Sequence, residues 1–216
     1  MHLNTVIFDM DGLLIDSEPY WQQAGMETLQ QFSASLTPHQ YHHTTGLRTP
    51  EWLDYWFSHF GISKDLIPDA TAQLHENVIE KIKTMAAPMP GIDYIFAYFK
   101  ERNFRIGLAT SSPLSLVDEV VEKLGIGHFL EAIASAEHLP YGKPHPQVYM
   151  DCAQALGVNP LDCCCFEDSF NGLVAAKAAR MKCVVIPTPD QYDLAKWGAA
   201  DLKLQSLADF DLSLFP

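Results

Sequence analysis

Carboxylate, hydroxyl and ammonium side chains follow short apolar runs at several places along the chain. They are Asp9 and Asp11 after residues 5–8, Thr110, Ser111 and Ser112 after residues 104–109, Lys143 ahead of a predicted helix, and Glu167 and Asp168 after residues 163–166. In an open parallel sheet the ligand crevice lies outside the carboxyl ends of the strands. We therefore expect these side chains to converge on one site.

Four acids, one lysine and a hydroxyl cluster form a set that suits a divalent cation and a phosphate. Carboxylates packed together repel one another unless they are protonated or neutralised, and their hard oxygen atoms suit Mg²⁺. Lys143, Thr110 and backbone amides can hold the oxygens of a phosphoryl group. Asp9 can attack phosphorus, and Asp11 can protonate the leaving oxygen and later activate water.

The apolar runs that precede these residues predict the strands of a parallel sheet. They cover residues 5–8, 104–109, 132–134, 163–166 and 183–186, and helical apolar spacing occurs between them over 93–102, 114–124, 146–156 and 172–179. Helices that alternate with strands apolar on both faces indicate a parallel sheet covered by helices. The sequence thus predicts an α/β fold with a Rossmann-like parallel sheet core.

Residues 16–87 interrupt this alternation. The segment lacks convincing strand patterns and has helical apolar spacing over 21–29, 52–60 and 74–82. Its borders, residues 17–19 and 88–91, contain prolines and look like linkers. We predict an α/β catalytic core of residues 1–15 and 88–216, with a helical cap domain of residues 16–87 inserted after the first strand.

Composition argues against several classes of protein. The 216 residues are 48% hydrophobic and 19% charged, which is enough apolar material for a substantial core. The net charge of −13 and the lack of a basic patch oppose binding to nucleic acid or anionic membranes. No apolar run is long enough for a membrane span, and no secretory leader is visible.

The chain has five cysteines, three of them consecutive, which suggests buried thiols in a reducing compartment. We expect a cytoplasmic monomer or weak oligomer.

Four ordered motifs resemble those of the haloacid dehalogenase-like hydrolase superfamily. They are FDMDG at residues 8–12, LATS at 108–111, KP at 143–144 and ED at 167–168. The resemblance spans nearly the whole chain and extends to the members with a helical cap, the β-phosphoglucomutases and the bacterial sugar-phosphate and hexitol-phosphate phosphatases. It implies Mg²⁺-dependent hydrolysis of a small phosphorylated metabolite, such as a sugar phosphate, through an aspartyl-phosphate.

The resemblance also implies a role for each matching residue. Asp9 would be the nucleophile and Asp11 the general acid/base. The metal would be held by Asp9, Asp168 and the backbone carbonyl of Asp11. Glu167 would either bind the metal directly or support the residues that do. Thr110, Ser111 and Lys143 would bind the phosphoryl group, Asn171 would orient the acidic loop, and Trp21 and Arg48 of the cap are candidates to contact the leaving group.

Other functions remain open on the sequence alone. A sugar phosphomutase needs the same core, but Trp21 stands where β-phosphoglucomutases carry a cap-hinge histidine. A dehalogenase lacks an acid equivalent to Asp11. A non-catalytic metabolite-binding protein on the same fold also stays open, because fold and motif do not prove turnover.

Three histidines of the cap, His39, His42 and His43, could suggest a zinc site. They have no acidic or cysteine partner at the spacing that such a site needs.

Overall fold

Six parallel strands form one sheet in the computed structural model, which describes residues 3–42, 44 and 46–215. They are β1 (Thr5–Phe8), β2 (Arg105–Thr110), β3 (Ala132–Ser135), β4 (Cys163–Glu167), β5 (Lys182–Val185) and β6 (Leu202–Lys203), in the spatial order β3-β2-β1-β4-β5-β6. In the register of the sheet, Phe8 pairs with Leu108 of β2 and with Phe166 of β4. The strand that leads to Asp9 therefore lies between those that end in Thr110 and Glu167.

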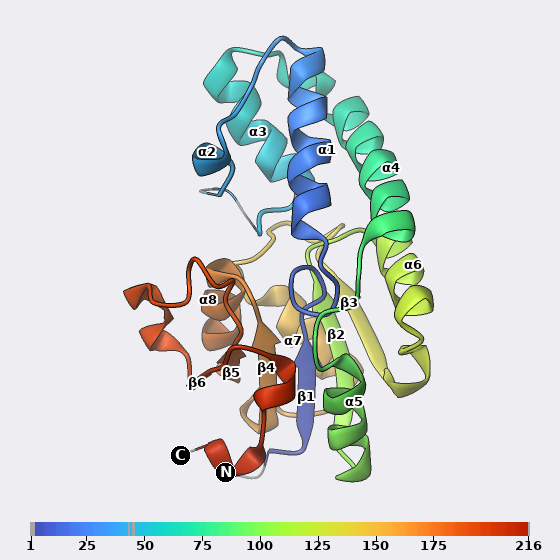
Figure 1. Ribbon diagram of the computed structural model, residues 1–216, viewed down its shortest axis with the longest axis vertical. Helices are drawn as coiled ribbons and strands as arrows, with labels where there is room; N and C mark the ends of the chain where they lie inside the picture. Colours follow the sequence, from blue (N-terminus) through green and yellow to red (C-terminus); the bar gives the residue numbers. More distant parts are fainter. Residues whose placement is uncertain (1–2, 43, 45, 216) are drawn as a thin grey trace.

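Helices cover both faces of this sheet (Figure 1). They are α5 (Ile92–Glu101) and α6 (Leu114–Leu124) on one face, and α7 (Gln147–Ala155) and α8 (Phe170–Ala178) on the other. Along β1, Phe8 packs in the same core as Phe96 of α5, whereas Ile7 packs in the same core as Leu173 of α8. This alternation follows from the two-residue period of a strand and explains why β1 is apolar throughout.

The α/β sheet predicted from the sequence is confirmed. The five strands and four helices predicted for the core lie within two residues of those observed. Strand β6 was not predicted because two residues are too few to show a period. Short 3-10 helices complete the chain at Lys64–Leu66, Gly127–Phe129, Pro160–Asp162, Ala195–Ala199, Leu207–Asp209 and Leu212–Leu214.

Four of the five α-helices between β1 and β2 in the described chain lie beyond the carboxyl ends of the strands (Figure 1). They are α1 (Glu18–Gln31), α2 (Pro38–His42), α3 (Thr49–Phe60) and α4 (Ile67–Met85). Trp52, Trp56 and Phe57 of α3 are buried in the same cluster as Leu29 of α1 and Val78 of α4. These aromatic residues therefore form the core of the helical segment itself, as their helical spacing indicated.

The two connections between the helical segment and the sheet lie side by side. The backbone N–H of Asp16 donates to the carbonyl of Ala87 at 2.9 Å, and that of Met89 donates to Leu14 at 3.0 Å. The helical segment thus leaves and re-enters the core at one place. Its division from the core at residues 16 and 87 stays a prediction.

Two further features bear on the expectations from composition. All five cysteines are buried and free, three of them on β4. Within the ranges that the structure describes, no helix combines the length and apolar character that crossing a bilayer requires.

Candidate active site

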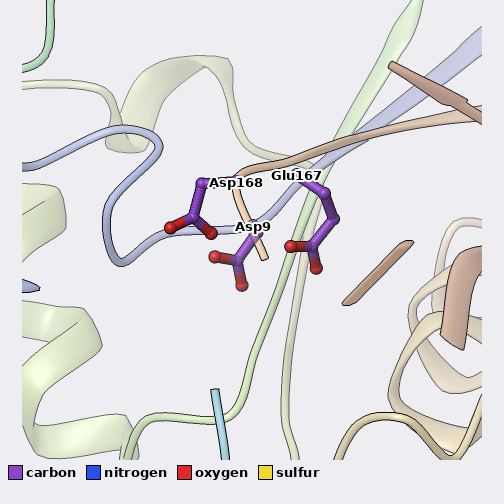
Figure 2. Close-up of side chains that lie close together, drawn as sticks. All are labelled: Asp9, Glu167 and Asp168. Atoms are coloured by element: carbon purple, nitrogen blue, oxygen red, sulfur yellow. The ribbon is translucent and has the colours of Figure 1, made fainter. Parts of the chain in front are cut away.

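Three carboxylates meet at the carboxyl ends of the central strands. Asp9 follows β1, Glu167 is the last residue of β4, and Asp168 comes next in the chain. Ligand atoms of the three side chains all lie within 4.8 Å of one another. Figure 2 shows the three carboxylates grouped together. The backbone N–H of Asp9 donates to the carbonyl of Phe166 at 3.0 Å and so holds the two strand ends together.

The ammonium group of Lys143 lies among these acids. Its Nζ donates to Oδ1 of Asp9 at 2.6 Å, to Oε1 of Glu167 at 2.6 Å and to the carbonyl of Ala109 at 3.0 Å. Burial lowers the pKa of Lys143, but the charges of Asp9 and Glu167 outweigh it and hold this pKa above its ordinary value. Lys143 is therefore a buried cation held between two acidic side chains.

One ammonium group does not neutralise the whole cluster. Burial raises the pKa of Asp9 to about 8, although Lys143 acts to lower it. Burial and the neighbouring charges of Asp9 and Glu167 also raise the pKa of Asp168 well above its ordinary value. A hard divalent cation bound by these oxygen atoms would relieve the repulsion, so the residues present fit such an ion.

Two glycines make room for the acids. Gly12 has φ +72°, and a Cβ there would overlap Oδ2 of Asp168. A Cβ on Gly172, in the first turn of α8, would overlap the carboxylate of Glu167. Glycine is therefore required at both positions for the chain to approach the carboxylates so closely.

Both oxygen atoms of Glu167 are already engaged by protein donors. Oε1 accepts from Lys143 and from the hydroxyl of Tyr149 at 2.5 Å, and Oε2 accepts from the N–H and hydroxyl of Ser169 at 3.3 and 3.1 Å. The side chain of Glu167 is fully buried. This arrangement suits a residue that holds Lys143 in place.

Asp11 lies at the junction between the core and the helical segment. Its Oδ1 accepts from the hydroxyl of Ser17 at 2.7 Å and from the indole N–H of Trp21 at 2.8 Å. Its Oδ2 accepts from the hydroxyl of Ser112 at 2.6 Å. Asp11 is thus fixed by donors from both sides of the junction.

The hydroxyl residues at the end of β2 lie on the same side of the sheet. Oγ1 of Thr110 accepts from the backbone N–H of Ser112 at 3.1 Å, and the side chain of Thr110 is buried. Oγ of Ser111 is buried and has no hydrogen-bond partner among the described residues. These groups are positioned to donate to an anion beside Asp9.

A cavity lies between the sheet edge and the helical segment. Its core side includes Asp9, Asp11, Thr110, Ser111, Lys143 and Asp168, and its helical side includes Glu18, Trp21, Tyr41, Arg48, Trp52 and Leu74. The structure therefore brings most of the predicted site residues around one cavity.

Two predicted site residues lie away from the cavity wall. Glu167 lies behind Lys143, where it supports the ammonium group. Asn171 lies in the first turn of α8, close to Gly46 of the helical segment: a Cβ added to Gly46 would lie 3.7 Å from the Cβ of Asn171.

Of the three histidines considered as zinc ligands, His39 is exposed and His43 lies outside the described residues. Thr45, in the loop before Arg48, also lies outside the described residues.

Sequence reasoning missed three residues that the structure adds to the site. Ser17 and Glu18 were interpreted as part of a linker, and Glu18 lines the cavity with a pKa that burial, and then the charge of Asp11, raise to about 7. An acidic residue in a first helical turn is so common that its type carried no signal. Tyr149 is six residues from Lys143 on the buried face of α7, and no sequence pattern distinguishes it from a core residue.

Comparisons with known proteins agree with this geometry. The family model described as haloacid dehalogenase-like hydrolase matches residues 6–186. Hexitol phosphatase B of Escherichia coli (strain K12) is 38% identical over 204 residues, which cover 94% of this chain and 92% of the relative. Fructose-1-phosphate phosphatase YqaB of the same strain is 29% identical over 188 residues, which cover 83% of this chain and 94% of the relative.

Solved structures agree as well. The crystal structure of CbbY from Rhodobacter sphaeroides in complex with phosphate has a TM-score of 0.86 and 26% sequence identity, and the match covers 96% of each chain. The resemblance inferred from the four motifs is thereby confirmed. The chain belongs to the haloacid dehalogenase-like hydrolases.

Proposed function

We propose that this protein is a Mg²⁺-dependent phosphatase that hydrolyses small phosphorylated metabolites, in particular sugar phosphates. The observation that carries this proposal is the grouping of Asp9, Asp11 and Lys143 around one cavity, which supplies a nucleophile, an acid/base and a cation. The relatives named hexitol phosphatase B and fructose-1-phosphate phosphatase support the substrate class.

The first step is phosphoryl transfer to Asp9. A carboxylate oxygen of Asp9 attacks phosphorus, and the bond from phosphorus to the leaving oxygen breaks. Asp11 gives its proton to that oxygen, so the alcohol leaves neutral. Nζ of Lys143 donates to Oδ1 of Asp9 at 2.6 Å and so positions the nucleophile. Together with Thr110 and Ser111, Lys143 also supplies hydrogen-bond donors for the oxygens of the transferring phosphoryl group.

The second step returns Asp9 to its starting state. Asp11, now a carboxylate, takes a proton from water, and the water oxygen attacks the phosphorus of the aspartyl-phosphate. The bond between phosphorus and Asp9 breaks, and inorganic phosphate leaves. Ser17, Trp21 and Ser112 hold Asp11 in the same place for both proton transfers.

The proposed metal site consists of Asp9, Asp168 and the backbone carbonyl of Asp11, with Glu167 acting through Lys143. When bound, Mg²⁺ would neutralise charge on the phosphoryl oxygens and hold the phosphate against Asp9. The raised pKa values of Asp9 and Asp168 support a cation at this point, because burial penalises both carboxylates as long as they lack one.

The helical segment of residues 16–87 is proposed to act as a cap that selects the leaving group, since the core residues recognise only features common to all phosphomonoesters. The partner is proposed to be a small phosphorylated molecule, and the net charge of −13 opposes binding of nucleic acid.

The cytoplasm is proposed as the location of the protein, because its five free thiols suit reducing conditions.

Release of inorganic phosphate from a panel of hexitol and hexose phosphates tests the proposal. We expect turnover with Mg²⁺ and none with a chelator, and no turnover by Asp9→Asn under either condition. Undiminished activity in chelator would contradict the metal requirement. Substrate binding without any turnover by the wild type would instead indicate a non-catalytic metabolite-binding protein.

A further inference from the structure

Arg48, the residue before α3, reaches from the helical segment to the core. Its Nη1 donates to the carbonyls of Ala136, at 2.9 Å, and Leu139, and its Nη2 donates to the carbonyl of Pro140 at 3.2 Å. The side chain of Arg48 is only 10% exposed. Three carbonyls of the loop that leads from β3 to Lys143 therefore converge on one cation.

Glu51, in the first turn of α3, strengthens the same contact. Its Oε1 accepts from Nη2 of Arg48 at 2.6 Å and from the backbone N–H of Gly142 at 3.2 Å. Burial acts to raise the pKa of Glu51, but the hydrogen bonds from Arg48 and Gly142 lower it, so this carboxylate stays ionised. Glu51 thus joins the arginine of the helical segment to the core loop.

Gly142 lets the two surfaces approach closely. A Cβ at this position would lie 2.8 Å from Cγ and Nε of Arg48 and 2.9 Å from Oε2 of Glu51. Gly142 is not among the glycines with positive φ, so its own backbone conformation does not demand glycine. The requirement for glycine comes from Arg48 and Glu51.

We propose that Arg48, Glu51 and Gly142 form a latch that holds the helical segment closed over the cavity and positions the loop that ends in Lys143. The three are positioning residues, because Lys143 is the neighbour of Gly142 and its Nζ must reach Asp9. Opening returns Arg48 and Glu51 to water, where both ions are well solvated, so the latch opposes opening without preventing it.

The latch differs from a contact between Arg48 and the leaving group. A substrate contact makes Arg48 important and leaves Glu51 and Gly142 without a role. A latch makes the three residues equivalent, because loss of any one breaks the same interface. The two possibilities are therefore separated by how substitutions combine.

Hydrogen–deuterium exchange of the whole protein without substrate tests the latch directly. The variants are Arg48→Ala, Glu51→Ala, Gly142→Ala and the double variant Arg48→Ala/Glu51→Ala. The matched control is Glu119→Ala, which removes an exposed ion pair at 2.8 Å between Lys83 of α4 and Glu119 of α6, a different contact between the helical segment and the core. We expect the backbone amides of residues 136–139 and 141–142, and the non-proline amides of the first turn of α3, to exchange about tenfold faster in the latch variants and at the wild-type rate in the control.

Kinetics provide the second measurement and rest on the proposed phosphatase function. Each single latch variant should lower kcat/KM for a hexitol phosphate about tenfold, and the double variant should lose little more than either parent. Losses that multiply in the double variant, or unchanged exchange in the loop, would overturn the latch. A loss confined to Arg48→Ala, with Glu51→Ala and Gly142→Ala at wild-type activity, would assign Arg48 to the substrate.

Hydrogen–deuterium exchange tests the latch and phosphatase kinetics test the proposed function, so either hypothesis can be contradicted without the other. Faster exchange in the latch variants of a protein that has no phosphatase activity would keep the latch and contradict the proposed function. If Gly142→Ala does not fold, the exchange of Arg48→Ala and Glu51→Ala still decides the outcome.

Discussion

The indole N–H of Trp21 donates a hydrogen bond of 2.8 Å to Oδ1 of Asp11. An indole nitrogen is a donor only, so the group facing it must be an acceptor. Ser17 donates to the same oxygen, and both donors belong to the chain at the start of α1. The position of the proposed acid/base is therefore tied to that of the helical segment.

Trp21→Phe should impair proton transfer to poor leaving groups. Phenylalanine keeps a ring beside His75 but removes the donor that holds Asp11. We expect kcat/KM to fall about tenfold for phenyl phosphate and much less for a dinitrophenyl phosphate, whose leaving group needs less protonation. Steady-state kinetics on these substrates, which have similar rings, would measure the difference.

The control for this prediction is Trp56→Phe. Trp56 is also buried in the helical segment, and its indole N–H donates to Thr44 at 3.1 Å rather than to Asp11. Its leaving-group dependence should match that of the wild type. An equal loss on both aryl phosphates in Trp21→Phe would assign Trp21 to substrate contact, as the sequence suggested.

Asp9→Asn should abolish turnover and preserve the fold. An amide is nearly isosteric with a carboxylate but is a far poorer nucleophile, so we expect kcat to fall by roughly a thousandfold or more. Rapid-quench trapping with labelled substrate should place phosphate on the wild-type chain and not on the variant. Substantial activity in Asp9→Asn would contradict the proposed nucleophile.

Tyr149→Phe should destabilise the protein through Glu167. The hydroxyl of Tyr149 donates to Oε1 of Glu167 at 2.5 Å, and both side chains are fully buried. Loss of a buried donor to a charged group costs about 1 to 3 kcal/mol, which urea denaturation would measure. Tyr94→Phe is the control and should cost less, because the hydroxyl of Tyr94 donates to the carbonyl of Phe210 from a side chain that is 42% exposed.

The sheet and most of the site could be predicted because each depends on a local pattern. The run from Thr5 to Phe8 is buried on both sides, so its apolar character was visible without knowledge of its neighbours. Asp9, Thr110 and Glu167 then followed from the rule that parallel strands end at one edge. These predictions needed the position of a residue on its strand and nothing about tertiary contacts.

The partners of these residues could not be predicted because they depend on contacts between distant parts of the chain. Arg48 meets the carbonyls of a loop about ninety residues later, and Glu51 meets Gly142 across the same distance in sequence. Neither a charge pair in a first helical turn nor a glycine before Lys143 reveals such a contact. Trp21 was predicted to contact the leaving group and it lines the cavity, but its hydrogen bond to Asp11 depends on how α1 packs against the core.

The stability of the metal-free protein should fall as pH rises. Asp9 has an ordinary pKa of 3.8 and, through burial, a pKa of about 8 in the folded chain. Between these values the folded state holds a proton that the unfolded state has lost, so each pH unit within that window costs up to about 1.4 kcal/mol. Thermal unfolding in chelator should therefore show a Tm that decreases from about pH 5 to about pH 8.

Mg²⁺ should reverse this trend, because a cation bound by the acids replaces the proton on Asp9. The increase in Tm caused by Mg²⁺ should grow with pH over the same window, and taking the difference between Mg²⁺ and chelator removes titrations elsewhere in the chain. Asp168→Asn, which removes a proposed ligand, should shrink the increase at every pH. Asp9→Asn should flatten the pH dependence in chelator. A Mg²⁺ effect that is independent of pH, and equal in Asp168→Asn and wild type, would place the ion away from these carboxylates.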